Sequence, residues 1–117
     1  MKVSVIHSAF GDTPHVVAFV DVPDGTETNE ALEYAYRWTN NVMGSWSRKE
    51  KFFEDGTENG DYNENVTVMT PLNEGGMGLR STSMGDQMLV GTTKYEVAMM
   101  GFEAVSYTHL RAHETRI

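Results

Sequence analysis

The stretch RSTSMGDQMLVGTTKYEVAMMGFEAV, residues 80–105, holds the densest structural signal in the chain. Its apolar run at 87–90 has strand character. Gly91-Thr92 suits a tight hairpin turn, because glycine tolerates the positive φ that such turns need. Residues 94–100 then alternate between apolar and polar side chains, as in a half-buried strand. One face of the predicted hairpin is therefore apolar, and it carries Met88, Val90, Tyr95, Val97 and Met99.

Two features flank this hairpin. Gly101 interrupts the alternation, which predicts a bulge or bend that directs Phe102 into the core. Before the hairpin, the hydroxyl and Asp side chains of residues 81–86 can bond nearby backbone N–H groups, which predicts a fixed turn. The alternative is a loop that grips an anion, and Arg80 and Asp86 are kept as candidate binding residues. The turn is favoured, since no helix clearly follows it and Asp86 would repel a phosphate.

The order of motifs resembles that of a known group of proteins. RSTSMGD, a short strand, a turn and KYEVAMMGFEAV resemble a pattern in YodL-like domains and related small proteins of phages, plasmids and conjugative elements. In that pattern an arginine, hydroxyl residues and a Gly-Asp pair precede a hairpin that ends in Gly-Phe. The resemblance implies a setting in a phage or mobile element. It carries no established chemistry over to this chain.

Composition limits the class of protein. The chain has 117 residues, enough for one compact domain with a modest core. It has no cysteine, which excludes disulfides and cysteine-ligated metals. A net charge of −8 argues against broad binding to a phosphate backbone. No apolar run is long enough to span a membrane and no signal peptide is indicated, so we expect a cytoplasmic protein.

Further elements follow from residue patterns along the chain. Strands are predicted at 2–7 and 16–22, joined as a hairpin, and a short strand at 66–69. A helix is predicted from about 29 to 42, with Thr28 as its N-cap.

The periodicity of this helix predicts which side chains it buries. Val42 falls on the same face as Leu32 and Ala35. Glu33 and Arg37 are spaced to form an i,i+4 ion pair on the exposed side.

We therefore expect a single α+β domain over residues 1–103, in which a small, mostly antiparallel sheet packs against the main helix. Its predicted core residues are Val5, Val17, Phe19, Leu32, Ala35, Tyr36, Val90, Tyr95, Val97 and Phe102. Residues 104–117 resemble a string that translated sequencing adapter adds behind unrelated proteins. We expect them to be a non-native tail, of which residues 106–117 contribute almost nothing to stability.

The end of the predicted helix has the most unusual composition. Trp38 and Trp46 flank the pair Asn40-Asn41 and a glycine. Tryptophans close to a helix end can line a binding groove, although more often they close a core while the indole N–H finds a partner. If the protein has a binding surface, these four residues are the first candidates.

Residues 48–65 form a long polar segment that invites a calcium interpretation. Acidic and amide residues fall at some of the spacings of a calcium loop. The pattern fails because Val66 stands where the bidentate Glu belongs and Thr57 is a poor third ligand. We expect instead a solvated acidic loop, held at one end by Phe52 and Phe53, with no metal or cofactor.

No nucleotide-binding or hydrolase motif occurs in the sequence. His7 and His15 are possible general bases, but nothing pairs either with a nucleophile, so enzyme activity is not favoured. The leading hypothesis is a small accessory protein of a phage or mobile element that binds another protein. The alternatives are a nucleic-acid-binding module that stacks bases on Trp38 and Trp46, and a small hydrolase that uses one of the histidines. The oligomeric state is not predicted.

Overall fold

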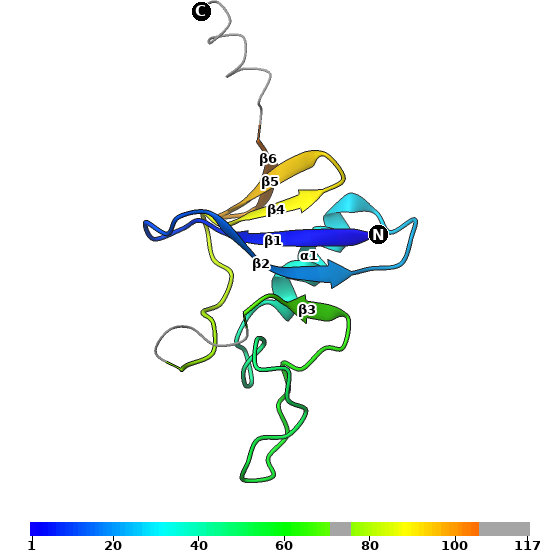
Figure 1. The fold of residues 1–117 in the computed structure, drawn as a ribbon. Helices are drawn as coiled ribbons and strands as arrows, with labels where there is room; N and C mark the ends of the chain where they lie inside the picture. The colour runs from blue at the N-terminus through cyan, green and yellow to red at the C-terminus, as the bar shows by residue number, and fades with distance from the viewer. Residues whose placement is uncertain (71–75, 106–117) are drawn as a thin grey trace, which may run out of the picture.

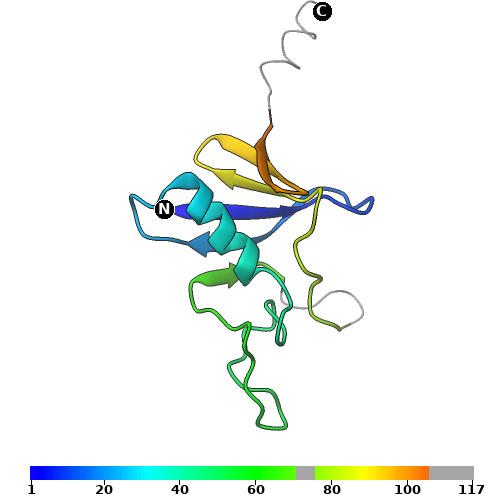
Figure 2. The same ribbon diagram turned by 180° about the vertical axis from the view of Figure 1, so that it is seen from behind.

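The computed structural model describes residues 1–70 and 76–105. Its elements are β1 (Lys2–His7), β2 (His15–Asp21), α1 (Thr28–Trp38), β3 (Val66–Val68), β4 (Gln87–Val90), β5 (Thr93–Ala98) and β6 (Gly101–Ala104). The strands form one sheet in the order β3-β2-β1-β4-β5-β6, and every neighbouring pair is antiparallel (Figure 1). α1 lies across one face of this sheet (Figure 2). The predicted α+β class is confirmed, although the sheet dominates.

The core lies between α1 and the covered face of the sheet. Alternation in β1 and β2 sends one set of side chains toward the helix, and this set is buried. The buried apolar residues of the core are Val3, Val5, Val17, Ala18, Val20, Val22, Ala31, Leu32, Ala35, Trp46, Val66, Met88 and Val97. Phe19 was predicted in this core, and that prediction is wrong. It pairs with Ser4 on the uncovered face, where the Lys2 amino group lies 5.9 Å from its ring centre.

The helix is shorter than predicted at its C-terminal end. α1 ends at Trp38, and the Thr39 hydroxyl donates to the carbonyl of Ala35, four residues earlier. The Asn40 amide likewise donates to a carbonyl of the last turn. These side chains satisfy carbonyls that a longer helix would have bonded through its backbone. Val42, predicted on the buried face, is consequently exposed.

The N-terminal cap also differs from the prediction. Glu27 occupies the N-cap position and Thr28 is the first helical residue. The Ala31 N–H donates to the Glu27 carbonyl, and no side chain caps the turn. Glu30 still places a negative charge in the first turn, where the helix dipole favours it.

The predicted hairpin is confirmed, and a further strand follows it. β4 and β5 meet at Gly91-Thr92, with Val90 opposite Thr93. β5 ends at Ala98, so the chain reverses at Met99-Met100 and returns as β6. Gly101 was predicted as a bulge or bend within one strand, but it opens this new strand with φ +130°, which other residues rarely adopt.

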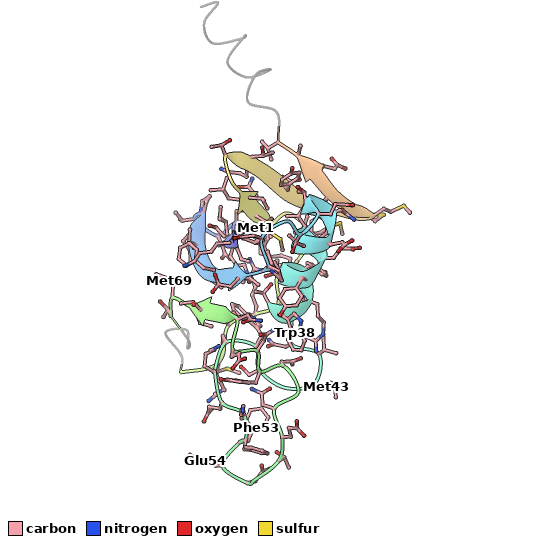
Figure 3. All side chains as sticks on the ribbon, turned by 90° about the vertical axis from the view of Figure 1, so that its right-hand side faces the viewer. Met1, Trp38, Met43, Phe53, Glu54 and Met69 are labelled. Carbon is pink, nitrogen blue, oxygen red and sulfur yellow. The ribbon has the colours of Figure 1, made fainter. Side chains whose placement is uncertain are left out.

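The segment of residues 48–65 extends away from the sheet, beyond β3 (Figures 1 and 3). Phe52 and Phe53 were predicted to hold one end of it. The Phe52 side chain is exposed and its backbone forms an isolated bridge with Glu58, whereas Phe53 is half-buried and its ring lies beside Gly44. The buried residues are Asn59 and Asp61, which were expected in solvent. Buried polar side chains therefore hold the segment against the rest of the protein, and its phenylalanines are not its main anchor.

The C-terminal part of the prediction is only partly described. The expected boundary after residue 103 falls inside β6, and the Val105 N–H donates to the Lys94 carbonyl. The first residue of the expected tail, Ala104, is the last residue of β6, and residues 106–117 of that tail lie outside the described residues. Among residues 1–70 and 76–105, no helix has the length and apolar character needed to cross a membrane.

Candidate functional site

Asp86 is fully buried, and its carboxylate is surrounded by donors. The N–H groups of Ser8 and Ala9 lie 2.8 and 2.9 Å from Oδ1, and the N–H of Ser83 lies 2.8 Å from Oδ2. The Arg80 guanidinium adds two contacts, at 2.6 Å to Oδ2 and 2.8 Å to Oδ1. We call these residues the Asp86 cradle. It confirms the predicted fixed turn and also ties that turn to the chain just after β1.

Local geometry holds the cradle against the sheet. Gly85 has φ +94°, and a Cβ there would lie 3.3 Å from the Cβ of Ala9. Its N–H donates to the Val97 carbonyl, and the Val97 N–H donates to the Asp86 carbonyl. Glycine is needed at this position for both its φ and the close approach.

The electrostatic balance keeps Asp86 ionised. Burial, the largest single effect, raises its pKa, but the Arg80 guanidinium and the three backbone N–H groups together lower the pKa to about 2. Arg80 is also held at 3.0 Å by Asp12. All the oxygens of Asp86 are thus committed to internal donors, and the carboxylate has no accessible proton-accepting role at neutral pH.

His7 continues the network beneath Asp86. Its Nε2 lies 3.0 Å from the Thr82 hydroxyl oxygen, which lies 2.8 Å from that of Thr39. Thr39 can only donate to the carbonyl of Ala35, so it accepts from Thr82, and Thr82 accepts from His7. Nε2 therefore carries the proton. Burial, opposed by Asp86, lowers the His7 pKa to about 4, so the ring is neutral at pH 7.

This geometry does not form a nucleophilic triad. In a triad the carboxylate and the nucleophile bind opposite nitrogens of the imidazole ring. Here Asp86 Oδ2, at 4.0 Å, and the Thr82 hydroxyl both face Nε2 of His7. Thr82 is buried as well. His15, the other predicted general base, is exposed, and its ring packs edge-on to His7 at 6.3 Å between centroids.

A second buried carboxylate has a similar environment. Asp61 Oδ2 accepts the consecutive N–H groups of Val42, Met43 and Gly44, at 2.8, 2.9 and 2.6 Å. Arg37 contacts Oδ1 at 3.2 Å. We call these residues the Asp61 cradle. It joins the chain after α1 to the segment of residues 48–65.

The structure brings four of the six predicted binding residues together. Arg80 and Asp86 bind each other, and the Trp46 indole N–H donates to the Arg80 carbonyl at 2.9 Å. Asn41 accepts from the Trp46 N–H and donates to the Leu79 carbonyl. Trp46 is 1% exposed, so its ring belongs to the core.

The other two predicted binding residues lie apart from this group. Trp38 lies at the end of α1 (Figure 3). It is half-buried, with the Arg37 guanidinium 4.1 Å from its ring centre and the Tyr34 ring 6.4 Å away between centroids. Asn40 caps the end of α1. The Trp46 ring is therefore closed to a nucleic-acid base, and Arg37 lies over the ring of Trp38.

An exposed apolar surface, missed by the sequence analysis, lies beside the Asp86 cradle. We call it the methionine tip, and its members are Phe10 (76% exposed), Met84 (53%), Met99 (82%) and Met100 (94%). Strand register places them at one end of the sheet. The Ser8 hydroxyl donates to the Gly85 carbonyl, and the Gly85 N–H donates to the Val97 carbonyl, so the turns that carry these side chains are neighbours.

Sequence signals for the tip existed in its turns. Met99-Met100 occupies the centre of a hairpin turn, where Gly, Asn and Asp are usual. Met84 interrupts a run of small polar residues. Met99 was instead predicted on the buried face of the strand, which is wrong because β5 ends one residue earlier.

In the part of the chain that the structure describes, no three His, Asp or Glu side chains are grouped so as to hold a metal ion. Comparisons with family models, with curated proteins and with solved structures found no match to this chain. The function is therefore inferred from the geometry alone.

Proposed function

We propose that the protein acts by binding another protein through the methionine tip. The single observation that carries this proposal is the exposure of four large apolar side chains at one end of the sheet. Scattered apolar residues are normal on a surface, whereas a contiguous apolar group marks an interaction site. Methionine suits such a site because its flexible side chain adapts to a partner.

The rigid base of the tip supports the same proposal. Met84 lies inside the turn that Asp86 fixes, and the Phe10 ring lies 4.9 Å from the Arg80 guanidinium. A surface held in place before binding loses less conformational entropy when a partner arrives. The setting that we propose, a phage or other mobile element, is supported only by the RSTSMGD and KYEVAMMGF pattern.

Affinity capture with three baits tests this function. Wild-type protein, the double variant Met99→Ser/Met100→Ser and the control Met69→Ser are immobilised and exposed to a bacterial lysate. Met69 is 53% exposed but lies on the β3 side of the molecule (Figure 3). We expect one captured protein to bind wild type and Met69→Ser, to be lost with the double variant, and to rebind as a purified protein.

Two results would overturn the proposal. One is the absence of any captured protein above background. The other is a partner whose binding to the purified chain is unchanged by Met99→Ser/Met100→Ser, since its contact would then lie elsewhere.

A further inference from the structure

A groove beside the methionine tip combines an apolar floor with a carboxylate. It has a volume of about 300 Å³ and lies between α1 and the β5–β6 hairpin. We call it the α1–β6 groove, and its lining includes Glu33, Tyr36, Val97, Met99 and Phe102. The rings of Tyr36 and Phe102 pack edge-on in it, with centroids 6.1 Å apart. The groove shares Met99 with the tip, so a partner on the tip reaches both.

Glu33 is the charged residue of the groove. The sequence predicted an ion pair with Arg37, but Arg37 bonds Asp61 and stacks on Trp38 instead. Among the described residues Glu33 has no ion-pair partner. Glu33 is exposed and lines the apolar groove, so its carboxylate can meet a cation of a partner.

Two more carboxylates lie on the other face of the same hairpin. Glu96 in β5 and Glu103 in β6 are directly opposite each other. Like charges in such a position destabilise a sheet. Within residues 1–70 and 76–105 neither glutamate has an ion-pair partner, and Lys94 is the cation on the same strand face. The Met99-Met100 turn is thus flanked by carboxylates on both sides.

On the basis of the protein-binding function above, we propose that the partner presents a basic amphipathic segment. Its apolar side chains cover Met99 and Met100 and enter the α1–β6 groove. Its Lys or Arg side chains meet Glu33 on one side and the Glu96–Glu103 pair on the other. The net charge of −8 favours the approach of such a segment.

Selection from a random peptide library on the wild-type protein tests this chemistry even while the natural partner is unidentified. Selected peptides are counter-screened against Met99→Ser/Met100→Ser. We expect the retained peptides to place Lys or Arg beside large apolar residues. Their dissociation constants should rise about fivefold with Glu33→Gln/Glu103→Gln, the effect of two exposed ion pairs.

The matched control is Glu54→Gln/Glu58→Gln, which changes the net charge equally in the segment of residues 48–65. Glu54 lies in the part of this segment that extends beyond β3 (Figure 3). We expect it to leave the affinity unchanged. Neutral or acidic peptides, or an equal loss with the control variant, would overturn the proposal while leaving protein binding at the tip intact. If no peptide distinguishes wild type from Met99→Ser/Met100→Ser, protein binding itself fails. A wild-type dimer dissolved by the same double variant would make a second copy the occupant, and the basic segment would be wrong.

Discussion

The Asp86 cradle and the methionine tip are neighbours with opposite burial: a charged side chain is buried in the first, and apolar side chains are exposed in the second. The cradle buries a carboxylate and saturates it with donors, while the tip exposes four large apolar side chains. Phe10 of the tip lies directly over Arg80 of the cradle. Buried polar groups and exposed apolar groups are the two departures from ordinary packing that carry information.

This difference in burial assigns a role to each region: the cradle stabilises the fold, and the tip is the surface available for binding. Polar groups that are internally satisfied hold the turns in place, but they have little left to offer a ligand. Apolar side chains in solvent contribute little to folding, and they gain free energy when a partner covers them. The charged residues that attract attention in the sequence are therefore structural, and the methionines beside them are the candidate contact surface.

The largest predicted effect on stability is that of Asp86→Asn. The amide oxygen can still accept from the N–H groups of Ser8 and Ala9, but the amide NH2 group then points at two donors, the Ser83 N–H and the Arg80 guanidinium. Arg80 also loses its buried negative charge. We expect a loss of about 4 kcal/mol in the free energy of unfolding, measured with urea. The control Asp12→Asn removes only the exposed partner of Arg80 and should cost less than about 1 kcal/mol. Equal losses in the two variants would contradict the central role of the buried carboxylate.

The protonation of His7 should make the free energy of unfolding depend on pH. Its pKa is about 4 in the folded protein, below the ordinary value of 6.5. Between these values the unfolded chain binds a proton that the folded chain does not, so stability falls by about 3 kcal/mol as pH drops from 6.5 to 4. Asp86, whose pKa is lowered to about 2, adds a further loss of about 2 kcal/mol as pH falls from about 4 to 2.

Urea unfolding at a series of pH values tests this sequence of losses. His7→Gln should remove the slope between pH 6.5 and 4, whereas His15→Gln should keep it. A slope that survives in His7→Gln would show that another group binds the proton.

The Asp61 cradle provides a second comparison with the Asp86 cradle. Both consist of a buried carboxylate bound by backbone N–H groups and an arginine, but the Asp61 carboxylate holds a loop and the Asp86 carboxylate holds turns at the sheet. Asp61→Asn should cost about 2 kcal/mol, less than Asp86→Asn, since Arg37 makes one contact of 3.2 Å. Amide hydrogen exchange should accelerate first at Val42, Met43 and Gly44, while the strands stay protected. Unchanged exchange at these amides would mean that Asp61 does not hold the loop.

Local patterns in the sequence predicted the elements that depend on neighbouring residues. The bounds of β1 and the turn at Gly91-Thr92 follow from alternation and turn chemistry. The turn before β4 was also predicted, because Asp86 bonds Ser83 within it. The two donors from Ser8 and Ala9 were not predictable, since they come from the other end of the sequence.

The errors share a physical cause in long-range contacts. The helix was predicted too long because nothing nearby indicates that Asp61 takes the N–H groups of Val42 and Met43. β6 was missed because Gly101 was interpreted as a bulge and not as the start of a returning strand. The tip was missed for the same reason, since Met99 leaves the buried face only if the chain turns there.

The most direct test of the division between cradle and tip measures stability and partner affinity on the same variant, Met99→Ser/Met100→Ser. If the tip serves binding alone, the free energy of unfolding should stay within about 0.5 kcal/mol of wild type, as for exposed surface positions. Affinity for the captured partner should fall at least about tenfold, equivalent to about 1.4 kcal/mol. If the variant loses more than about 1 kcal/mol of stability but binds its partner as wild type does, the tip serves folding and not binding, which contradicts the account.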